Sequence, residues 1–166
     1  MKAKTLASGL LLIGLTFSVI GFWLLQKPTP APNVTFTTIT GKKIELLQLR
    51  GKPVIVTFWA TDCAGCIKEV PHLIELYKQF HSQGLEIIAV AMYYDPPNHV
   101  VEMTKAKQIP YHVALDLKAQ HATAFGQVQL TPTSFLISPA GKVILQKTGE
   151  FDFFTMQQQI KKLIQG

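Results

Sequence analysis

The sequence predicts an α/β domain in which a mixed central β-sheet is flanked by helices, and three observations lead to this prediction. Two apolar runs rich in branched residues, 53–59 and 85–92, have the length and composition of buried strands. The segment 64–81 between them carries apolar residues at helical spacing. After residue 133, two further strand-like segments precede a final helix. Strands that alternate with helices before a closing hairpin and helix are typical of a mixed sheet.

The remaining elements follow from local signals. Residues 34–39 and 43–46 flank a Thr-Gly-Lys turn signal and are expected to form a β-hairpin. Asn98, after an Asp-Pro-Pro breaker, is expected to cap a helix over 100–108. The other expected elements are a strand at 112–115, a helix at 119–125, strands at 133–138 and 142–148, and an amphipathic helix at 152–164.

The N-terminal segment differs from the rest of the chain. Residues 6–25, from Leu6 to Leu25, form a run of 20 residues without a charge, which as a helix would span about 30 Å, the thickness of a bilayer core. Lys2 and Lys4 outweigh Lys27, so the N-terminus is expected in the cytoplasm and the remainder outside it. A cleaved signal peptide is the alternative, but its apolar region is shorter and ends in small residues. We therefore expect an uncleaved membrane anchor at 1–27.

Composition sets the domain organisation and excludes several classes of function. The proline-rich segment 28–33 favours an extended linker between the anchor and one domain at 34–166. The net charge of +6 falls to +3 when the first 27 residues are left out, and the lysines are dispersed. This balance gives no case for nucleic-acid binding. Two cysteines exclude both a disulfide-rich scaffold and a four-thiolate zinc site.

The two cysteines carry the chemistry that the sequence indicates. Cys63 and Cys66 lie three residues apart where a buried strand ends and a helix begins. Free backbone N–H groups and the helix dipole favour an anion there, and a thiolate is the nucleophile of disulfide exchange. Cys63 is expected to be the attacking thiol, and Cys66 the more buried, resolving thiol. A structural disulfide closing so short a loop would add little stability, and a metal site would need further ligands.

The segment 54–71, Val-Ile-Val-Thr-Phe-Trp-Ala-Thr-Asp-Cys-Ala-Gly-Cys-Ile-Lys-Glu-Val-Pro, resembles the active-site segment of thioredoxin-like proteins. More narrowly, it resembles the membrane-anchored TlpA/ResA-type thiol-disulfide oxidoreductases of bacteria. Residues 41–44, 49–53 and 131–137 fit that subfamily as well, and the likeness covers 34–166. It implies a thioredoxin-like fold preceded by an N-terminal β-hairpin and one transmembrane helix.

The resemblance also implies roles for individual residues. Pro132 matches the family's cis-proline, whose loop faces the cysteines and leaves the Thr131 backbone free to bind an extended substrate segment. Trp59 is expected to form a wall of the active site and, with Thr131 and Pro132, to bind the substrate. Glu69, three residues after the second cysteine, is expected to have a raised pKa and to exchange protons with the thiols. Thioredoxin itself uses an aspartate where this chain has Thr57.

Two departures from the family pattern bear on the redox potential. Asp62 stands where relatives carry a bulky residue, and it is expected either to oppose ionisation of Cys63 weakly or to cap the helix. The Ala64-Gly65 dipeptide between the cysteines offers no ionic stabilisation of a thiolate. Strong oxidants owe their potential to a stabilised reduced form, so we expect a reductant or a middling exchanger. Pro71 matches the family's helix-kinking proline.

Together these features predict a bacterial inner-membrane protein whose catalytic domain faces the periplasm or the cell exterior. The resemblance implies that it reduces disulfides in exported proteins, such as apocytochrome c or copper-site proteins of oxidase assembly. A membrane electron donor of the thiol-reductase type would restore the dithiol, and no metal or other cofactor is expected. The alternative is a thioredoxin-fold copper chaperone, in which His112 or His121 would complete a site with the cysteines. A peroxide reductase and a redox-inactive scaffold are weaker alternatives.

Overall fold

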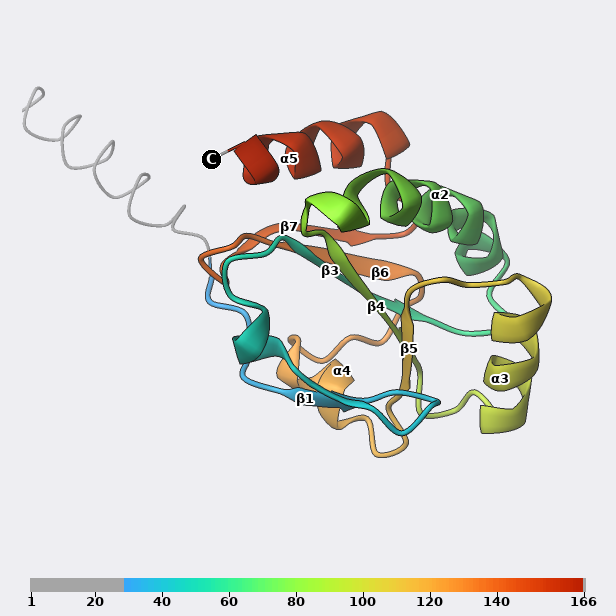
Figure 1. The fold of residues 1–166 in the computed structure, drawn as a ribbon. Coiled ribbons are helices and arrows are strands. Elements are labelled where there is room, and N and C mark those ends of the chain that lie inside the picture. Colours follow the sequence, from blue (N-terminus) through green and yellow to red (C-terminus); the bar gives the residue numbers. More distant parts are fainter. Residues whose placement is uncertain (1–28, 166) are drawn as a thin grey trace, which may run out of the picture.

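A five-stranded mixed sheet in the order β5-β4-β3-β6-β7 forms the centre of the computed structural model, which describes residues 29–165 (Figure 1). A separate two-stranded sheet pairs β1 with β2. In chain order the elements are β1 (Thr35–Thr37), β2 (Lys43–Glu45), a 3₁₀ turn η1 (Leu46–Leu49), β3 (Val54–Trp59), α2 (Ala64–Phe80), a 3₁₀ turn η2 (His81–Gln83), β4 (Glu86–Ala91), α3 (Pro97–Ala106), β5 (His112–Leu115), α4 (Gln120–Ala124), β6 (Thr133–Ile137), β7 (Val143–Thr148) and α5 (Phe153–Gln165). The predicted thioredoxin-like fold with its N-terminal hairpin is confirmed.

Strand β3 lies in the middle of the sheet and leads directly to the cysteines. It runs parallel to β4, with Trp59 opposite Ala91, and antiparallel to β6, with Phe58 opposite Thr133. Strand β5 continues the parallel part beyond β4, and β7 pairs antiparallel with β6. The carboxyl ends of β3, β4 and β5 and the start of β6 therefore meet at one end of the sheet.

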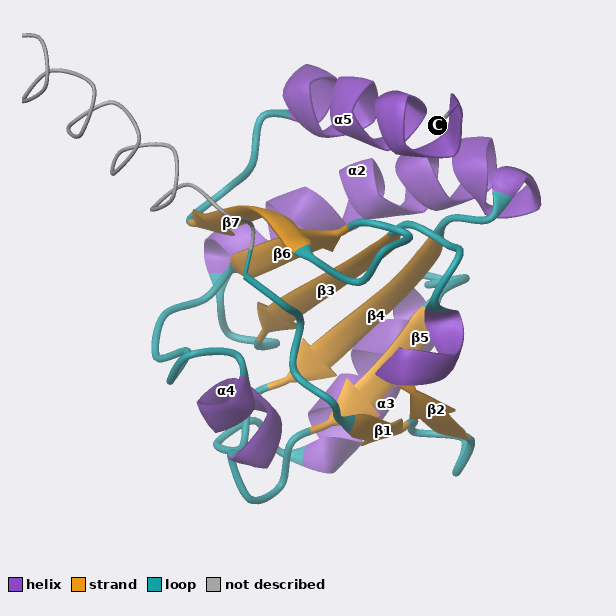
Figure 2. Cartoon of the chain, turned by 90° about the vertical axis from the view of Figure 1, so that its left-hand side faces the viewer, coloured by secondary structure: helices purple, strands orange, loops and turns teal. Residues whose placement is uncertain are grey.

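Two apolar clusters cover the two faces of the sheet. One cluster packs α2, α3 and α5 against the sheet through residues such as Leu76, Val100 and Ile160, and the other packs α4 and the hairpin through Phe36 and Phe125 (Figure 2). Every residue of β3 and β4 is buried as a result. This burial on both sides explains why their sequences are mostly apolar and show no alternation of apolar and polar residues.

Helix α3 begins earlier than the sequence indicates. It starts at Pro97, so Asn98 lies within the first turn, and the predicted Asn98 cap is wrong. Proline suits the first turn because its missing N–H is one that the helix would leave unpaired there. The residue before the helix is also a proline, Pro96, and it makes no side-chain cap.

The predicted anchor at 1–27 lies outside the described residues, as does Pro28 of the predicted linker. Within residues 29–165, none of the helices combines the length and the apolar character that crossing a membrane requires. The transmembrane helix and the domain boundaries therefore stay predictions from the sequence.

Candidate active site

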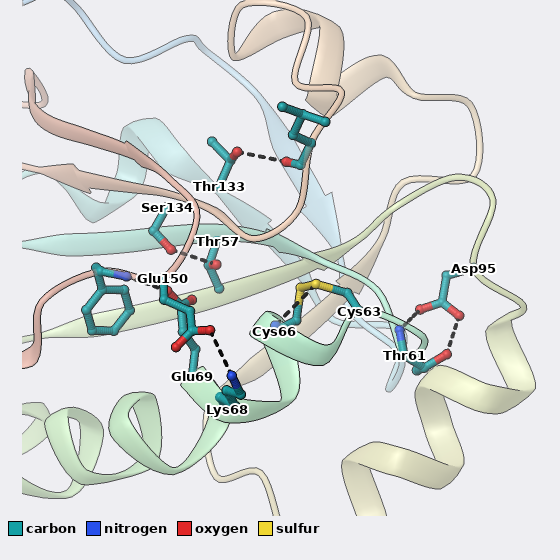
Figure 3. Close-up of a disulfide and its surroundings, with 12 residues drawn as sticks. Thr57, Thr61, Cys63, Cys66, Lys68, Glu69, Asp95, Thr133, Ser134 and Glu150 are labelled. Carbon is teal, nitrogen blue, oxygen red and sulfur yellow. Dashed lines mark hydrogen bonds and ion pairs between the residues drawn. A yellow bond between two sulfur atoms is a disulfide. The ribbon is translucent and has the colours of Figure 1, made fainter.

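The two cysteines form a disulfide at the first turn of α2, directly after β3 (Figure 3). Their Cα atoms are 5.2 Å apart. Cys66 is only 3% exposed, whereas Cys63 is partly exposed. The sequence-based expectation that Cys66 is the more buried sulfur is confirmed, and Cys63 is the sulfur that a partner can reach.

The helix start stabilises negative charge on the outer sulfur. Cys63 is itself the N-cap of α2, and its Sγ accepts a hydrogen bond of 3.2 Å from the Cys66 N–H. This arrangement combines an unpaired backbone donor with the positive end of the helix dipole. When the disulfide opens, the sulfur that ionises most readily is therefore the accessible one.

Asp62 does not cap the helix, because the sulfur of Cys63 occupies that role. Its side chain is exposed and lines an open groove of about 440 Å³ between the cysteine loop and α3. His99 and Glu102 of α3 face the same groove. Of the two expectations for Asp62, the cap is wrong, and its charge stands in contact with solvent, which screens its effect on Cys63.

The Pro132 loop lies directly against the cysteine turn. The Thr131–Pro132 peptide bond is cis, as the resemblance implies. A Cβ atom built on Gly65 would lie 3.3 Å from Pro132 Cδ and 3.5 Å from Glu150 Oε1, so the missing side chain lets the loop approach the disulfide. Among residues 29–165, no backbone–backbone hydrogen bond outside the regular elements uses Thr131. The Thr131 backbone beside the disulfide is therefore available to a bound chain.

Glu69 is buried one turn beyond Cys66. Its side chain is 2% exposed, and its Oε1 accepts a hydrogen bond of 2.8 Å from the Phe151 N–H. Burial raises the pKa of Glu69 from 4.5 to about 7; the Phe151 hydrogen bond opposes this rise, and the nearby charge of Glu150 adds to it. A carboxyl group with this pKa changes its protonation state near neutral pH.

A small internal cavity of about 10 Å³ joins Glu69 to the buried sulfur. Its lining includes Cys66, Glu69, Thr57, Trp59 and Tyr111. Trp59 is 4% exposed, so its ring forms an internal wall, as the resemblance implies. Its Nε1 has no hydrogen-bond partner among the described residues. The cavity gives the Glu69 carboxyl group and the buried cysteine a common space.

Thr57, which replaces the aspartate of thioredoxin, is fully paired within the sheet. The Ser134 hydroxyl donates a hydrogen bond of 2.8 Å to Thr57 Oγ1 across the β3–β6 pair. Both residues are almost completely buried. Glu69 is therefore the acidic side chain that lines the cavity beside Cys66.

Asp95 is a site residue that the sequence reasoning did not find. It is 4% exposed, and its carboxylate accepts hydrogen bonds from the Thr61 N–H at 2.7 Å and from the Thr61 hydroxyl at 2.6 Å. These bonds fix the chain two residues before Cys63 (Figure 3). The sequence does contain a signal for this role, because Asp95 follows a buried strand. The two prolines after it, however, favoured an interpretation of the segment as a break between a strand and a helix.

The structure does not bring the candidate copper-binding histidines to the cysteines. His121 is buried with its ring centroid 4.8 Å from that of Phe36, in the cluster on the sheet face opposite Cys66. His112 begins β5, and its Nε2 lies 3.9 Å from Glu86 Oε2 at the far end of the sheet. Within residues 29–165, no three His, Cys, Asp or Glu side chains are placed to hold a metal ion.

Comparisons with known proteins agree with this geometry. Among solved structures, a thiol:disulfide interchange protein of the thioredoxin family from Chlorobium tepidum TLS has a TM-score of 0.76 at 29% identity, covering 83% of this chain and 97% of that chain. A putative thioredoxin from Neisseria meningitidis has a TM-score of 0.77 at 29% identity, covering 84% and 93%. The fold is therefore shared with disulfide-exchanging proteins.

Comparisons of the amino-acid sequence identify a narrower group of relatives. The thiol-disulfide oxidoreductase ResA of Bacillus thuringiensis subsp. konkukian is 33% identical over 174 residues, covering 98% of this chain and 99% of that protein. ResA of Bacillus subtilis is 39% identical over 125 residues, covering 75% and 69%. The model of the AhpC/TSA family matches residues 28–146. With its cysteine pair at the start of α2, the chain belongs to the AhpC/TSA family of thioredoxin-like proteins and, within it, to the thiol-disulfide oxidoreductases of the ResA type.

Proposed function

We propose that this chain is an extracytoplasmic reductase that is anchored in the bacterial cytoplasmic membrane and reduces disulfides in exported proteins. One observation carries the proposal: an accessible Cys63 is paired with a buried Cys66, which shares an internal cavity with Glu69. The apolar run at 6–25 and the lysine balance around it support the location. Its domains are an anchor at 1–27, a linker at 28–33 and a catalytic domain beginning at residue 34.

The reaction begins when the Cys63 thiolate attacks one sulfur of a substrate disulfide. The substrate S–S bond breaks, a mixed disulfide with Cys63 forms, and the other substrate sulfur leaves as a thiolate that takes a proton from water. Cys66 then attacks Cys63 Sγ, which closes the Cys63–Cys66 disulfide and releases the second substrate thiolate. Two electrons pass from the enzyme to the substrate, and a dithiol donor in the membrane restores the reduced pair.

Glu69 accepts the proton that Cys66 must lose before its attack. Cys66 is shielded from solvent, so its proton needs an internal acceptor, and the two side chains line one cavity. A pKa of about 7 lets the Glu69 carboxylate take up this proton and release it again near neutral pH. Glu69 thereby determines how the second step depends on pH.

The Pro132 loop holds the substrate during both steps. The free backbone of Thr131 pairs with an extended segment of the substrate in the manner of an added strand. Trp59 does not contact this segment, since it is buried under the disulfide, where it supports the wall of the cavity.

The chain acts as a reductant because no positive charge stabilises a thiolate between the cysteines. Ala64 and Gly65 carry no charge, and Asp62 is negative. Its substrates are apocytochrome c or copper-site proteins of oxidase assembly, as the resemblance of residues 34–166 to TlpA/ResA-type proteins implies. Copper binding is the second candidate function, but no observation favours it, because neither His112 nor His121 lies with the cysteine pair.

The test compares cysteine variants of the purified full chain in insulin reduction with dithiothreitol as the donor. Cys63→Ser is expected to abolish the activity, since it removes the attacking sulfur. Cys66→Ser, reduced and then freed of dithiothreitol before it is mixed with insulin, is expected to accumulate a mixed disulfide with the substrate, visible as a covalent adduct on a non-reducing gel. Undiminished reduction by Cys63→Ser would refute the assignment of the nucleophile.

A further inference from the structure

Most of the large apolar side chains that are exposed in residues 29–165 lie at the end of the sheet where Cys63 lies. Seven large apolar residues are exposed among those the structure describes, and four of them lie in loops at the end of the sheet that carries Cys63. These four are Tyr93, Tyr94, Leu117 and Leu130. Exposed apolar residues that gather at one place on a soluble surface indicate an interaction site, whereas scattered ones do not.

Tyr93 and Tyr94 form an aromatic pair on a fixed loop. They are 57% and 47% exposed, and their rings meet edge to face with centroids 5.3 Å apart. The loop closes through a hydrogen bond of 3.0 Å from the Asp95 N–H to the Met92 carbonyl. The Asp95 carboxylate also ties the loop to Thr61, two residues before Cys63. The loop that carries the pair is therefore tied to the segment that leads to Cys63, so the pair is held there at little further cost in conformational entropy.

The sheet order places this pair across Cys63 from the Pro132 loop. Strand β4, which leads to the tyrosines, and strand β6, which follows Pro132, lie on opposite sides of β3. Two strand spacings separate the loops by about 10 Å, which three residues of extended chain span. A polypeptide that pairs with Thr131 and is disulfide-bonded to Cys63 therefore reaches the tyrosines within about two or three residues of its cysteine.

We propose that Tyr93 and Tyr94 bind an apolar or aromatic side chain near the reactive cysteine of the substrate polypeptide. The polypeptide that occupies this surface is the disulfide substrate itself, because the substrate becomes covalently joined to Cys63 during the reaction. Tyrosine rings are frequent at the energetic centres of protein interfaces, since they bury much area with little loss of side-chain freedom. The inference rests on the proposed function and adds a sequence preference to it.

The test uses two cystine-bridged peptides that differ only in the residue two positions from the reactive cysteine, phenylalanine or glycine. The reduced full chain is mixed with each peptide, and its oxidation is followed by tryptophan fluorescence. The wild type is expected to react about tenfold faster with the phenylalanine peptide, the size of one well-packed aromatic contact. The Tyr93→Ala/Tyr94→Ala double variant is expected to react equally with both.

Three controls separate the possible causes. Leu47→Ala removes another exposed apolar side chain, at the opposite end of the sheet, and is expected to keep the preference. Tyr93→Phe/Tyr94→Phe retains the rings and is expected to keep it as well. The small aliphatic disulfide bis(2-hydroxyethyl) disulfide carries no aromatic or large apolar group, so the wild type and the double alanine variant are expected to react with it equally.

The outcomes distinguish this inference from the function on which it rests. If the wild type reacts with the small disulfide but shows no preference between the peptides, or if the double alanine variant keeps the preference, the inference is wrong and the reductase activity stands. If the reduced wild type reacts with no disulfide at all, the proposed function itself is wrong.

Discussion

Glu69→Gln is expected to remove a specific pH dependence from the stability of the oxidised protein. The pKa of Glu69 rises from 4.5 to about 7 because the carboxyl group is buried, so the folded chain keeps a proton that the unfolded chain releases between these values. The folded state therefore binds more protons in this window, and the free energy of unfolding falls as the pH rises through it. Glutamine has nearly the same shape, can accept the Phe151 hydrogen bond and does not titrate.

The size of the effect follows from the two pKa values. One pKa unit corresponds to about 1.4 kcal/mol, so a rise from 4.5 to about 7 amounts to about 3 kcal/mol. The wild type is expected to lose about this much stability between pH 4.5 and pH 7, relative to the variant. Below pH 4.5 Glu69 is protonated in both the folded and the unfolded state, and above pH 7 it is ionised in both. Outside this window, the difference in unfolding free energy between wild type and variant is therefore constant.

The assay is urea denaturation of the oxidised full chain, followed by tryptophan fluorescence at intervals from about pH 4 to pH 8. The disulfide keeps both cysteines from titrating. Burial lowers the pKa values of His112 and His121, which gives a slope of the opposite sign, but both histidines are present in the wild type and in the variant. Subtracting one curve from the other therefore isolates Glu69. Parallel curves would refute the reasoning that burial raises this pKa.

Three further predictions concern the residues around the disulfide. Asp95→Ala leaves the Thr61 N–H without its acceptor and is expected to lower the free energy of unfolding by about 2 kcal/mol; Asp95→Asn, which retains one acceptor, should lose less in the same urea titration. Gly65→Ile is expected to displace the Pro132 loop and to slow peptide disulfide reduction more than reduction of a small disulfide, because a Cβ at this position already lies 3.3 Å from Pro132; equal slowing of both would contradict this. His121→Ala is expected to leave any copper affinity of the reduced chain unchanged in a copper titration, because His121 packs against Phe36 on the opposite face.

The elements of the central sheet could be predicted because their signals are local. The runs around Ile55 and Ile88 are mostly apolar and show no alternation of apolar and polar residues, as burial on both faces requires of such strands. The cysteine turn was equally clear, since strand, cysteine pair and helix are adjacent in sequence. Family resemblance then pointed to Pro132 and Glu69, which lie far apart in the chain but both beside the cysteine turn.

Contacts between distant segments could not be predicted from local patterns. The N–H that bonds Glu69 belongs to Phe151, 82 residues later, and nothing near either residue indicates this pairing. The link from Asp95 to Thr61 spans 34 residues and was hidden by the prolines that follow the aspartate. At the start of a helix, more than one nearby side chain can act as the N-cap. Here the N-cap of α2 is Cys63, through its sulfur, and not Asp62.

The reduction potential of the Cys63/Cys66 couple tests the central claim most directly. It is measured by equilibrating the full chain with glutathione buffers and with the more strongly reducing dithiothreitol buffers, each of graded composition, and counting free thiols. We expect a single reversible two-electron couple near thioredoxin's value of about −270 mV. A potential near about −120 mV, or a disulfide that never opens across the buffer range, would contradict the assignment as a reductase.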